Sequence, residues 1–164
     1  MNIYEQIEAE IKTASHIVIT SHKSADGDSV GSSLGLLHFI EKLGKTATVC
    51  HPDPAPNFLH WMDTSAFLLM TEQAEAVTAA FEAADLVFCL DYNATSRVGP
   101  DMQALLEAVT CKTVMIDHHL NPESFPTLTV SETTASSTSE LIVELVEQSG
   151  NGAFLDEKIG TPDR

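Results

Sequence analysis

The residues best suited to chemistry lie at three points of the sequence, each directly behind an apolar run. They are His22, Asp26 and Asp28 behind residues 16–21, Asp91 behind residues 86–90, and Asp117, His118 and His119 behind residues 113–116. In open α/β sheets, ligands bind beyond the carboxyl ends of the strands. Three strand ends that finish in carboxylate or imidazole therefore predict one shared site for a divalent metal.

The mixture of ligand types narrows the choice of ion. Imidazole combined with carboxylate favours Mn²⁺, Fe²⁺ or Zn²⁺, whereas sites built only from oxygen favour Mg²⁺ or Ca²⁺. Asp91 is placed to bridge two ions, which lie about 3.5–4 Å apart in phosphatase-type sites. Either His118 or His119 would then complete the coordination sphere of the second ion.

Two further features favour a phosphate beside these ligands. Gly31-Ser32-Ser33 falls in the expected first turn of a helix, where backbone N–H groups attract an anion. Arg97 lies six residues after Asp91. Its guanidinium group can donate two parallel N–H hydrogen bonds to a phosphate. The constellation is therefore interpreted as a site for a phosphorylated substrate.

The elements that must position these residues alternate between strand and helix. Predicted strands cover residues 16–21, 46–50, 86–91, 113–116 and 128–130, and predicted helices cover residues 2–14, 30–43, 72–84, 101–109 and 136–149. A short helix and turn is expected within residues 58–70. This alternation predicts βαβ crossovers and a parallel sheet. The expected fold is a three-layer, Rossmann-like α/β domain with helices on both faces.

Charge and composition exclude several classes of protein. The 24 acidic and 8 basic residues give a formal charge of −16, which repels long duplex DNA or RNA but not a small phosphorylated substrate delivered to a metal. No apolar stretch approaches the ~20 residues needed to span a bilayer, and the first residues lack the features of a signal peptide. We therefore expect a cytoplasmic protein without a membrane partner, and the sequence leaves open whether it is a monomer or a homodimer.

Taken together, the three motifs resemble those of the DHH phosphoesterase superfamily. The matching residues are Ser21-His22, Asp26-Gly27-Asp28 and Gly31-Ser32, then Leu90-Asp91 with Arg97, then Ile116-Asp117-His118-His119. This superfamily contains RecJ-type exonucleases, family II pyrophosphatases, exopolyphosphatases and nano-RNA ribonucleases. Residues 134–140 are similar to the segment that follows the triplet in the nano-RNase and pAp-phosphatase branch.

The resemblance implies two Mn²⁺ ions, with Mg²⁺ or another divalent ion as the alternative. His22, Asp26 and Asp91 would bind one ion, and Asp28, Asp91 and His118 would bind the second. The catalytic residues would be His119 near the substrate phosphate, Asp117 behind the ligands and Arg97. Lys23 and Ala25 stand where the family usually has Asn and Pro, at positions that are not ligands.

Relatives in this superfamily continue into a fourth motif and a smaller C-terminal substrate-binding domain. Asp156 and Asp163 do not match that motif. Residues 1–164 are therefore interpreted as the catalytic domain alone, without the C-terminal domain, and we expect them to be part of a longer protein.

The resulting hypothesis is a phosphoesterase that uses two-metal activation of water. Its substrates would be short oligoribonucleotides, 3′-phosphoadenosine 5′-phosphate (pAp), or both. Three alternatives stay open at this point: a pyrophosphatase or exopolyphosphatase of the same superfamily, a metal-binding domain that is inactive alone, and a small-molecule-binding domain without metal.

Overall fold

The computed structural model describes residues 2–56, 62–118, 127–132 and 134–149. In chain order the elements are α1 (Ile3–Thr13), β1 (Ile17–Ser21), α2 (Gly27–Lys42), β2 (Ala47–His51), β3 (Leu68–Leu69), α3 (Ala74–Ala83), β4 (Leu86–Leu90), the 3₁₀ helix η2 (Thr95–Val98), α4 (Pro100–Ala108), β5 (Lys112–Asp117), β6 (Leu128–Ser131) and α5 (Thr138–Gln148).

The strands form a parallel sheet in the order β3-β2-β1-β4-β5-β6. Val18 of β1 pairs with Thr48 of β2 on one side and with Val87 of β4 on the other. The chain first builds outward from β1 through β2 and β3, and then crosses back to place β4 on the opposite side of β1. The order therefore reverses between β1 and β4, which is where ligands bind in such sheets.

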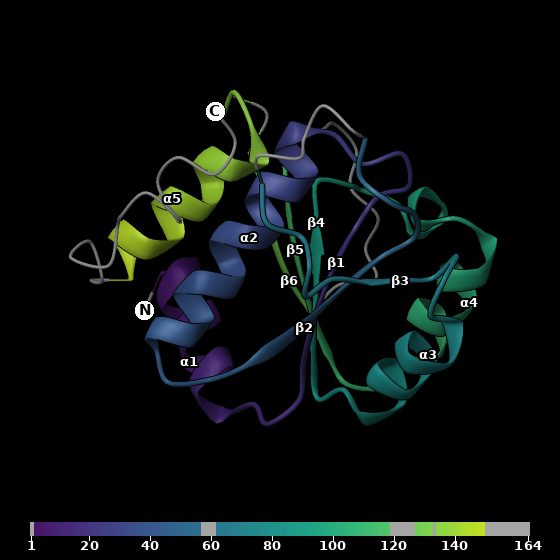
Figure 1. Ribbon diagram of the computed structural model, residues 1–164. Helices are drawn as coiled ribbons and strands as arrows, with labels where there is room; N and C mark the ends of the chain where they lie inside the picture. The colour runs from purple at the N-terminus through teal and green to yellow at the C-terminus, as the bar shows by residue number, and fades with distance from the viewer. Residues whose placement is uncertain (1, 57–61, 119–126, 133, 150–164) are drawn as a thin grey trace.

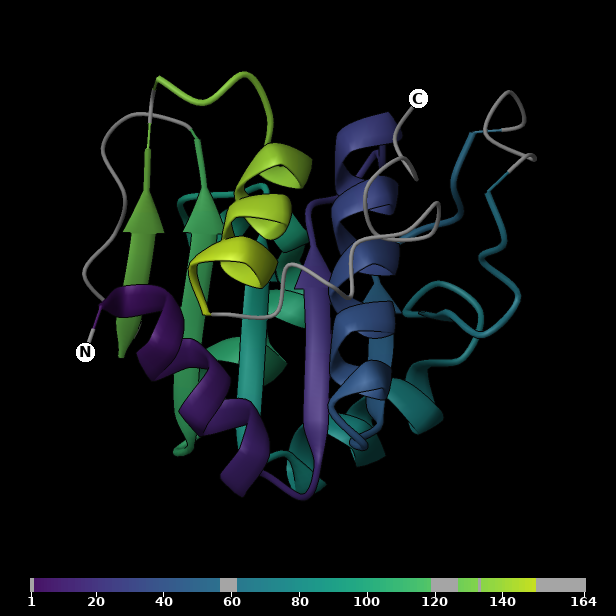
Figure 2. The same cartoon turned by 90° about the vertical axis from the view of Figure 1, so that its left-hand side faces the viewer.

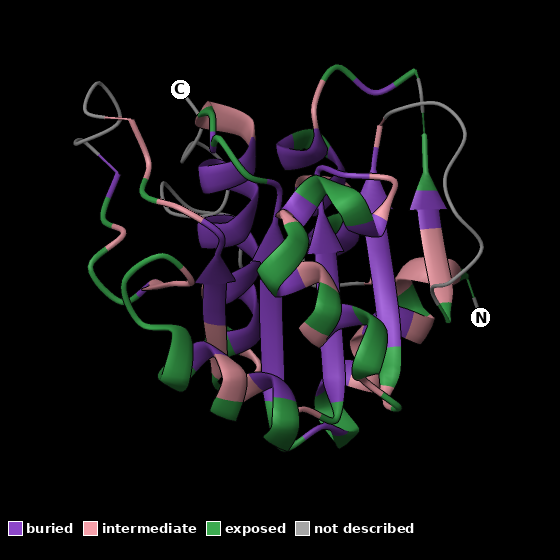
Figure 3. Ribbon diagram, turned by 90° about the vertical axis from the view of Figure 1, so that its right-hand side faces the viewer, coloured by how far each residue is buried: buried purple, intermediate pink, exposed green. Residues whose placement is uncertain are grey.

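Helices cover both faces of this sheet, as the alternation of elements predicted. Helices α1, α2 and α5 lie on one face and α3 and α4 on the other (Figures 1 and 2). Successive side chains of a strand point to opposite faces, so Ile19 joins the core beneath α1, α2 and α5, whereas Val18 joins the core beneath α3 and α4. The central strands β1 and β4 are buried along their whole length (Figure 3). The predicted three-layer α/β fold is confirmed.

Helix α2 begins at Gly27, three residues before the start expected from apolar spacing. Asp26 caps it: the Asp26 carboxylate accepts a hydrogen bond from the Ser29 amide at 2.8 Å, and the Ser29 hydroxyl accepts one from the Asp26 amide at 2.9 Å. This reciprocal pair satisfies two backbone donors and starts the helix inside the predicted loop.

The earlier start overturns the expected anion contact of Gly31-Ser32-Ser33. These residues lie in the second turn of α2, where their amides are used inside the helix. The hydroxyls of Ser32 and Ser33 are buried and donate to the Ser29 carbonyl at 3.3 and 2.7 Å. The two hydroxyls are therefore buried and bonded within α2, and they do not present donors to a phosphate.

The described part of the segment expected to form a short helix and turn contains a turn but no helix. Residues 57–61 lie outside the described part of the chain, and residues 62–70 form a turn followed by the short edge strand β3. The Asp63 carboxylate accepts hydrogen bonds from the amide and hydroxyl of Ser65, which stabilises the turn. Beyond β3, the Met70 amide donates to the His51 carbonyl at 2.9 Å and continues the pairing with β2.

The longest described helix, α2, has 16 residues. In the part of the chain that the structure describes, no helix has both the length and the apolar character required to cross a membrane.

Candidate metal centre

The carboxyl ends of β1, β4 and β5 bring the ligand-type residues into two groups of three. The first group is His22, Asp26 and Asp91, and the second is Asp28, Asp91 and His118. Within each group the candidate ligand atoms lie within 4.8 Å of one another. Asp91 belongs to both groups, and it is also the residue that the resemblance assigns to both ions.

The two carboxylate oxygens of Asp91 face different groups. Its Oδ2 lies 3.0 Å from Nε2 of His22, and its Oδ1 lies 3.4 Å from Nε2 of His118. Asp26 Oδ2 lies 3.8 Å from the same His22 nitrogen, and Asp28 Oδ2 lies 3.5 Å from the His118 nitrogen. A carboxylate with one oxygen in each group has the geometry needed to bridge two neighbouring cations.

An unusual backbone conformation sets the direction of the Asp91 side chain. Asp91 directly follows β4 and has a φ of +65°, in the left-handed region that few residues other than glycine adopt. Aspartate and asparagine tolerate this region better than most residues. The Asp91 amide donates to the Ile116 carbonyl at 3.1 Å, which holds the turn against the adjacent strand. The chain thus stores local strain where the carboxylate enters the site.

His22 is oriented by its second ring nitrogen. Nδ1 lies 2.7 Å from the Lys23 carbonyl and therefore carries the proton of that hydrogen bond, which directs Nε2 towards Asp91. Hydrogen bonds of this kind fix the tautomer of metal-binding histidines.

The charges of the pair favour a bound proton or cation. Burial alone would lower the pKa of His22, but its hydrogen bonds to Asp91 and Lys23 and the charges of Asp91 and Asp26 raise it overall. For Asp91, burial and the charge of Asp28 raise the pKa against the opposing effect of His22. The Nε2 lone pair of a neutral His22 and the oxygen of an ionised Asp91 cannot face each other at 3.0 Å without a proton or a cation between them. The donor set therefore fits a divalent metal, which would displace that proton.

Access to the centre is greatest beside Asp26. The Asp26 side chain is 59% exposed, whereas the Asp91 side chain is 3% exposed and the His118 side chain 25%. One Asp26 oxygen caps α2, while the other faces His22. The centre is therefore most exposed at Asp26, and Asp91 lies buried at its base.

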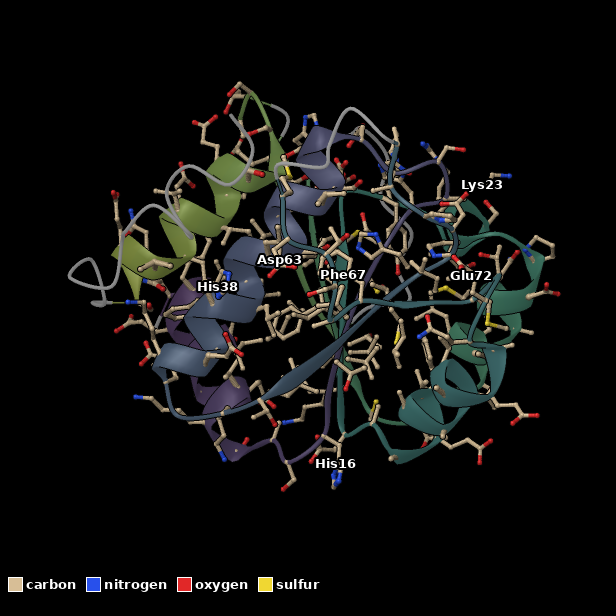
Figure 4. All side chains as sticks on the ribbon, viewed as in Figure 1. His16, Lys23, His38, Asp63, Phe67 and Glu72 are labelled. Atoms are coloured by element: carbon tan, nitrogen blue, oxygen red, sulfur yellow. The ribbon has the colours of Figure 1, made fainter. Side chains whose placement is uncertain are left out.

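The structure does not bring every predicted residue into these groups. Asp117 is the last residue of β5 and is fully buried, and His119 lies outside the described residues. Arg97 is exposed in η2, and its backbone carbonyl accepts a hydrogen bond from the Lys23 amide at 2.8 Å. Among the described residues, its side chain has no hydrogen bond or ion pair. Lys23 lies at the end of the molecule opposite His16 (Figure 4).

Sequence reasoning missed the buried histidine at the end of β2. His51 is 1% exposed, its Nε2 lies 2.9 Å from the Ser33 hydroxyl, and its ring packs against Phe67 at a centroid distance of 4.8 Å. Because the Ser33 hydroxyl donates to the Ser29 carbonyl, it accepts the proton of His51. His51 therefore supports the first turns of α2, and its place at the end of the apolar run 46–50 was the available signal.

We expect His51 to destabilise the fold in mild acid. Burial, and secondarily the charge of His22, lowers its pKa to about 3, whereas an unfolded histidine titrates near ~6.5. Below ~6.5 only the unfolded chain takes up this proton, so stability is complete above that pH and is lost as the pH falls towards 3. Between pH 7 and 5 the loss from this one group is about 2 kcal/mol.

The measurement is urea unfolding of wild type and His51→Gln at both pH values, without metal. Glutamine keeps a donor near the Nε2 position but does not titrate. The variant should lose about 2 kcal/mol less stability than wild type over this interval. Equal pH dependence of the two proteins would contradict the assignment of a buried neutral His51.

Comparison with known proteins yields one family and several relatives. The DHH family, N-terminal domain, matches residues 16–161. The bifunctional oligoribonuclease and PAP phosphatase NrnA of Thermus thermophilus is 31% identical over 135 residues, which cover 82% of this chain and 37% of that protein.

Solved structures share the fold. An exopolyphosphatase-related protein from Bacteroides fragilis has a TM-score of 0.93 and 36% identity, and the match covers 98% of this chain and 47% of that one. RecJ from Thermus thermophilus in complex with Mn²⁺ has a TM-score of 0.51 and 18% identity over 92% of this chain and 22% of that one, which shows the fold alone. The chain spans 37% of the length of NrnA and 47% of the Bacteroides protein.

Proposed function

The chain belongs to the DHH family, and on this premise we propose that it is the catalytic part of a metal-dependent phosphoesterase acting on short oligoribonucleotides, on pAp, or on both. The observation that carries the proposal is the pair of ligand groups that share Asp91 at the reversal point of the sheet. Two adjacent cation sites joined by one carboxylate suit reactions at phosphorus.

Electrostatics make a cation necessary for this activity. Asp26, Asp28 and Asp91 place three carboxylates at the site of a chain whose formal charge is −16. Such a site repels phosphate until divalent cations neutralise it. Bound there, Mn²⁺ or another divalent ion would polarise phosphoryl oxygens and make a nucleophile available near neutral pH.

The residues of the chain have separate parts in the proposed reaction. His22, anchored by the Lys23 carbonyl, and Asp91, fixed by its turn, hold the base of the centre in one geometry. Asp26 and His118 form its more open side. His119, Asp117 and Arg97 are the proposed catalytic residues, with Arg97 supplying a cationic fork to the substrate from the exposed η2.

The negative charge of the chain favours short substrates over long ones. A long polyanion would bring many phosphates against a net negative surface, whereas a nucleotide or short oligonucleotide brings few. The relative from Thermus thermophilus, named as an oligoribonuclease and PAP phosphatase, supports the same choice.

A second candidate substrate is inorganic polyphosphate or pyrophosphate. It is favoured by the 36% identity to the exopolyphosphatase-related protein from Bacteroides fragilis. The same metal centre serves either reaction, so the choice depends on contacts outside the ligand groups.

The proposed function is tested by incubating the chain and Mn²⁺ with pAp, a trinucleotide RNA, pyrophosphate and a short polyphosphate in parallel. We expect phosphate from pAp or mononucleotides from the RNA, and no product after chelation of the metal. Product only from the inorganic substrates would favour the second candidate. Tight Mn²⁺ binding without any product would instead support a metal-binding domain that is inactive alone.

A further inference from the structure

The first turn of α5 lies directly on two of the candidate ligands. The amides of Thr138 and Ser139 donate to Oδ2 and Oδ1 of Asp28, each at 2.9 Å. The Thr138 hydroxyl donates to Oδ1 of Asp91 at 3.2 Å. Helix α5 packs beside α2 on the same face of the sheet (Figure 2), so one turn reaches a carboxylate of α2 and the carboxylate behind β4.

The contacts to Asp28 use donors that the helix cannot satisfy by itself. The first amides of an α-helix have no partner within the helix. In α5 the amide of Glu140 is capped by Ser137, and the amides of Thr138 and Ser139 are both taken by Asp28. The positive end of the helix dipole thus lies against this carboxylate, and both of its oxygens are fixed.

The contact to Asp91 is made by a side chain with no exposure to solvent. Thr138 is 0% exposed and Asp91 2%, so water does not compete freely for this hydrogen bond. Its length of 3.2 Å exceeds the usual ~2.7–2.8 Å for a hydroxyl donor, which makes it an orienting contact more than a strong one. It holds Oδ1 on the side of Asp28 and His118 while His22 holds Oδ2.

We propose that Thr138 is a positioning residue of the metal centre: its hydroxyl orients the shared carboxylate of Asp91, while its amide holds Asp28. The proposal rests on the metal centre of the proposed function and assigns a role to the segment 134–140. The three carboxylates of the centre repel one another. They therefore need fixed hydrogen-bond partners to keep a geometry that can bind a metal ion. Without the hydroxyl, Asp91 keeps only His22 and His118 as side-chain partners among these contacts, and it can rotate away from the second group.

The test compares Mn²⁺ affinity, without substrate, in wild type, Thr138→Val, Thr138→Ser and Thr138→Ala by titration calorimetry. Valine keeps the shape of threonine but has no hydroxyl, serine restores it, and alanine removes the hydroxyl without adding a methyl group against Asp91. Partners that orient metal ligands typically change affinity by about 10- to 100-fold. We expect Thr138→Val and Thr138→Ala to bind at least about tenfold more weakly, and Thr138→Ser to stay within about twofold of wild type.

Thr113→Val is the matched control. Like Thr138, Thr113 is a buried threonine: it is 5% exposed, and its hydroxyl accepts one hydrogen bond, from the Thr127 amide. It lies near the amino end of β5, away from the site. It should bind Mn²⁺ as wild type does, even if its unfolding midpoint falls. A comparable loss of affinity in Thr113→Val would show that general destabilisation, not orientation of Asp91, explains the effect and would overturn the proposal.

Asp91→Asn separates this inference from the proposed function. If Asp91→Asn loses Mn²⁺ while Thr138→Val and Thr138→Ala keep wild-type affinity, the positioning role is overturned and the metal centre stands. If Asp91→Asn binds as wild type does, the metal centre itself is wrong and the role of Thr138 falls with it. If one Thr138 variant does not fold, as judged by circular dichroism, the other decides the result.

Discussion

Asp91→Asn is expected to abolish divalent-cation binding at both ligand groups and to reduce hydrolysis of every substrate to background. Asp91 is the only residue common to the two groups found among the described residues, and each of its oxygens faces one of them. Substitution of a residue that merely orients a ligand costs about 10- to 100-fold in affinity. Removal of a charged ligand shared by two ions should therefore exceed that range.

Asparagine is the informative replacement at this position because it keeps the backbone intact. The φ of +65° at Asp91 would strain most side chains, but asparagine adopts the left-handed region as readily as aspartate. The amide is also uncharged, so it removes the repulsion from Asp28 that raises the pKa of Asp91. We therefore expect the metal-free variant to fold normally, and any loss of cation binding reports on the site itself.

Thermal unfolding with and without Mn²⁺ provides the measurement. A ligand that binds only the folded state stabilises it by about 2.7 kcal/mol at a concentration 100 times its Kd. Wild type should gain this stability with Mn²⁺, and Asp91→Asn should gain none. A Mn²⁺-dependent rise in Tm of equal size in both proteins would show that the ion binds elsewhere.

The convergence of the site could be predicted from sequence because it follows from the sheet. Apolar runs separated by helical segments indicate parallel strands, and the carboxyl ends of parallel strands meet at one edge. That argument places His22, Asp91 and His118 together without any knowledge of distances. It also explains why the fold was predicted correctly while several element boundaries were not.

The missing details are those that depend on local capping or on contacts between distant segments. The start of α2 at Gly27 follows from the Asp26–Ser29 capping box, which lies outside the apolar stripe used to find the helix. The left-handed turn at Asp91 has no sequence signal, since aspartate occurs in many conformations. The hydrogen bonds from the first amides of α5 to Asp28 join residues about 110 positions apart. They follow only from the packing of α5 against α2.

The packing of α5 against α2 gives different contacts to two aspartates that look equivalent in the sequence. The variants Asp26→Asn and Asp28→Asn should therefore differ in stability. Each variant removes one carboxylate from one group, so each should reduce the number of bound Mn²⁺ ions from two to one. Asp26→Asn should leave stability nearly unchanged, because asparagine caps a helix as well as aspartate and can still accept from the Ser29 amide.

Asp28→Asn should in addition lower the free energy of unfolding by about 1–3 kcal/mol. Both oxygens of Asp28 accept backbone N–H groups, from Thr138 and Ser139, and an asparagine has only one oxygen. Its NH₂ group must face a second donor, or one amide of α5 must lose its partner. Urea unfolding without metal measures this difference, with Asp26→Asn as the matched control for the same chemical change two residues away. Equal stability of the two variants would mean that the hydrogen bonds between Asp28 of α2 and the amides of α5 do not form in solution.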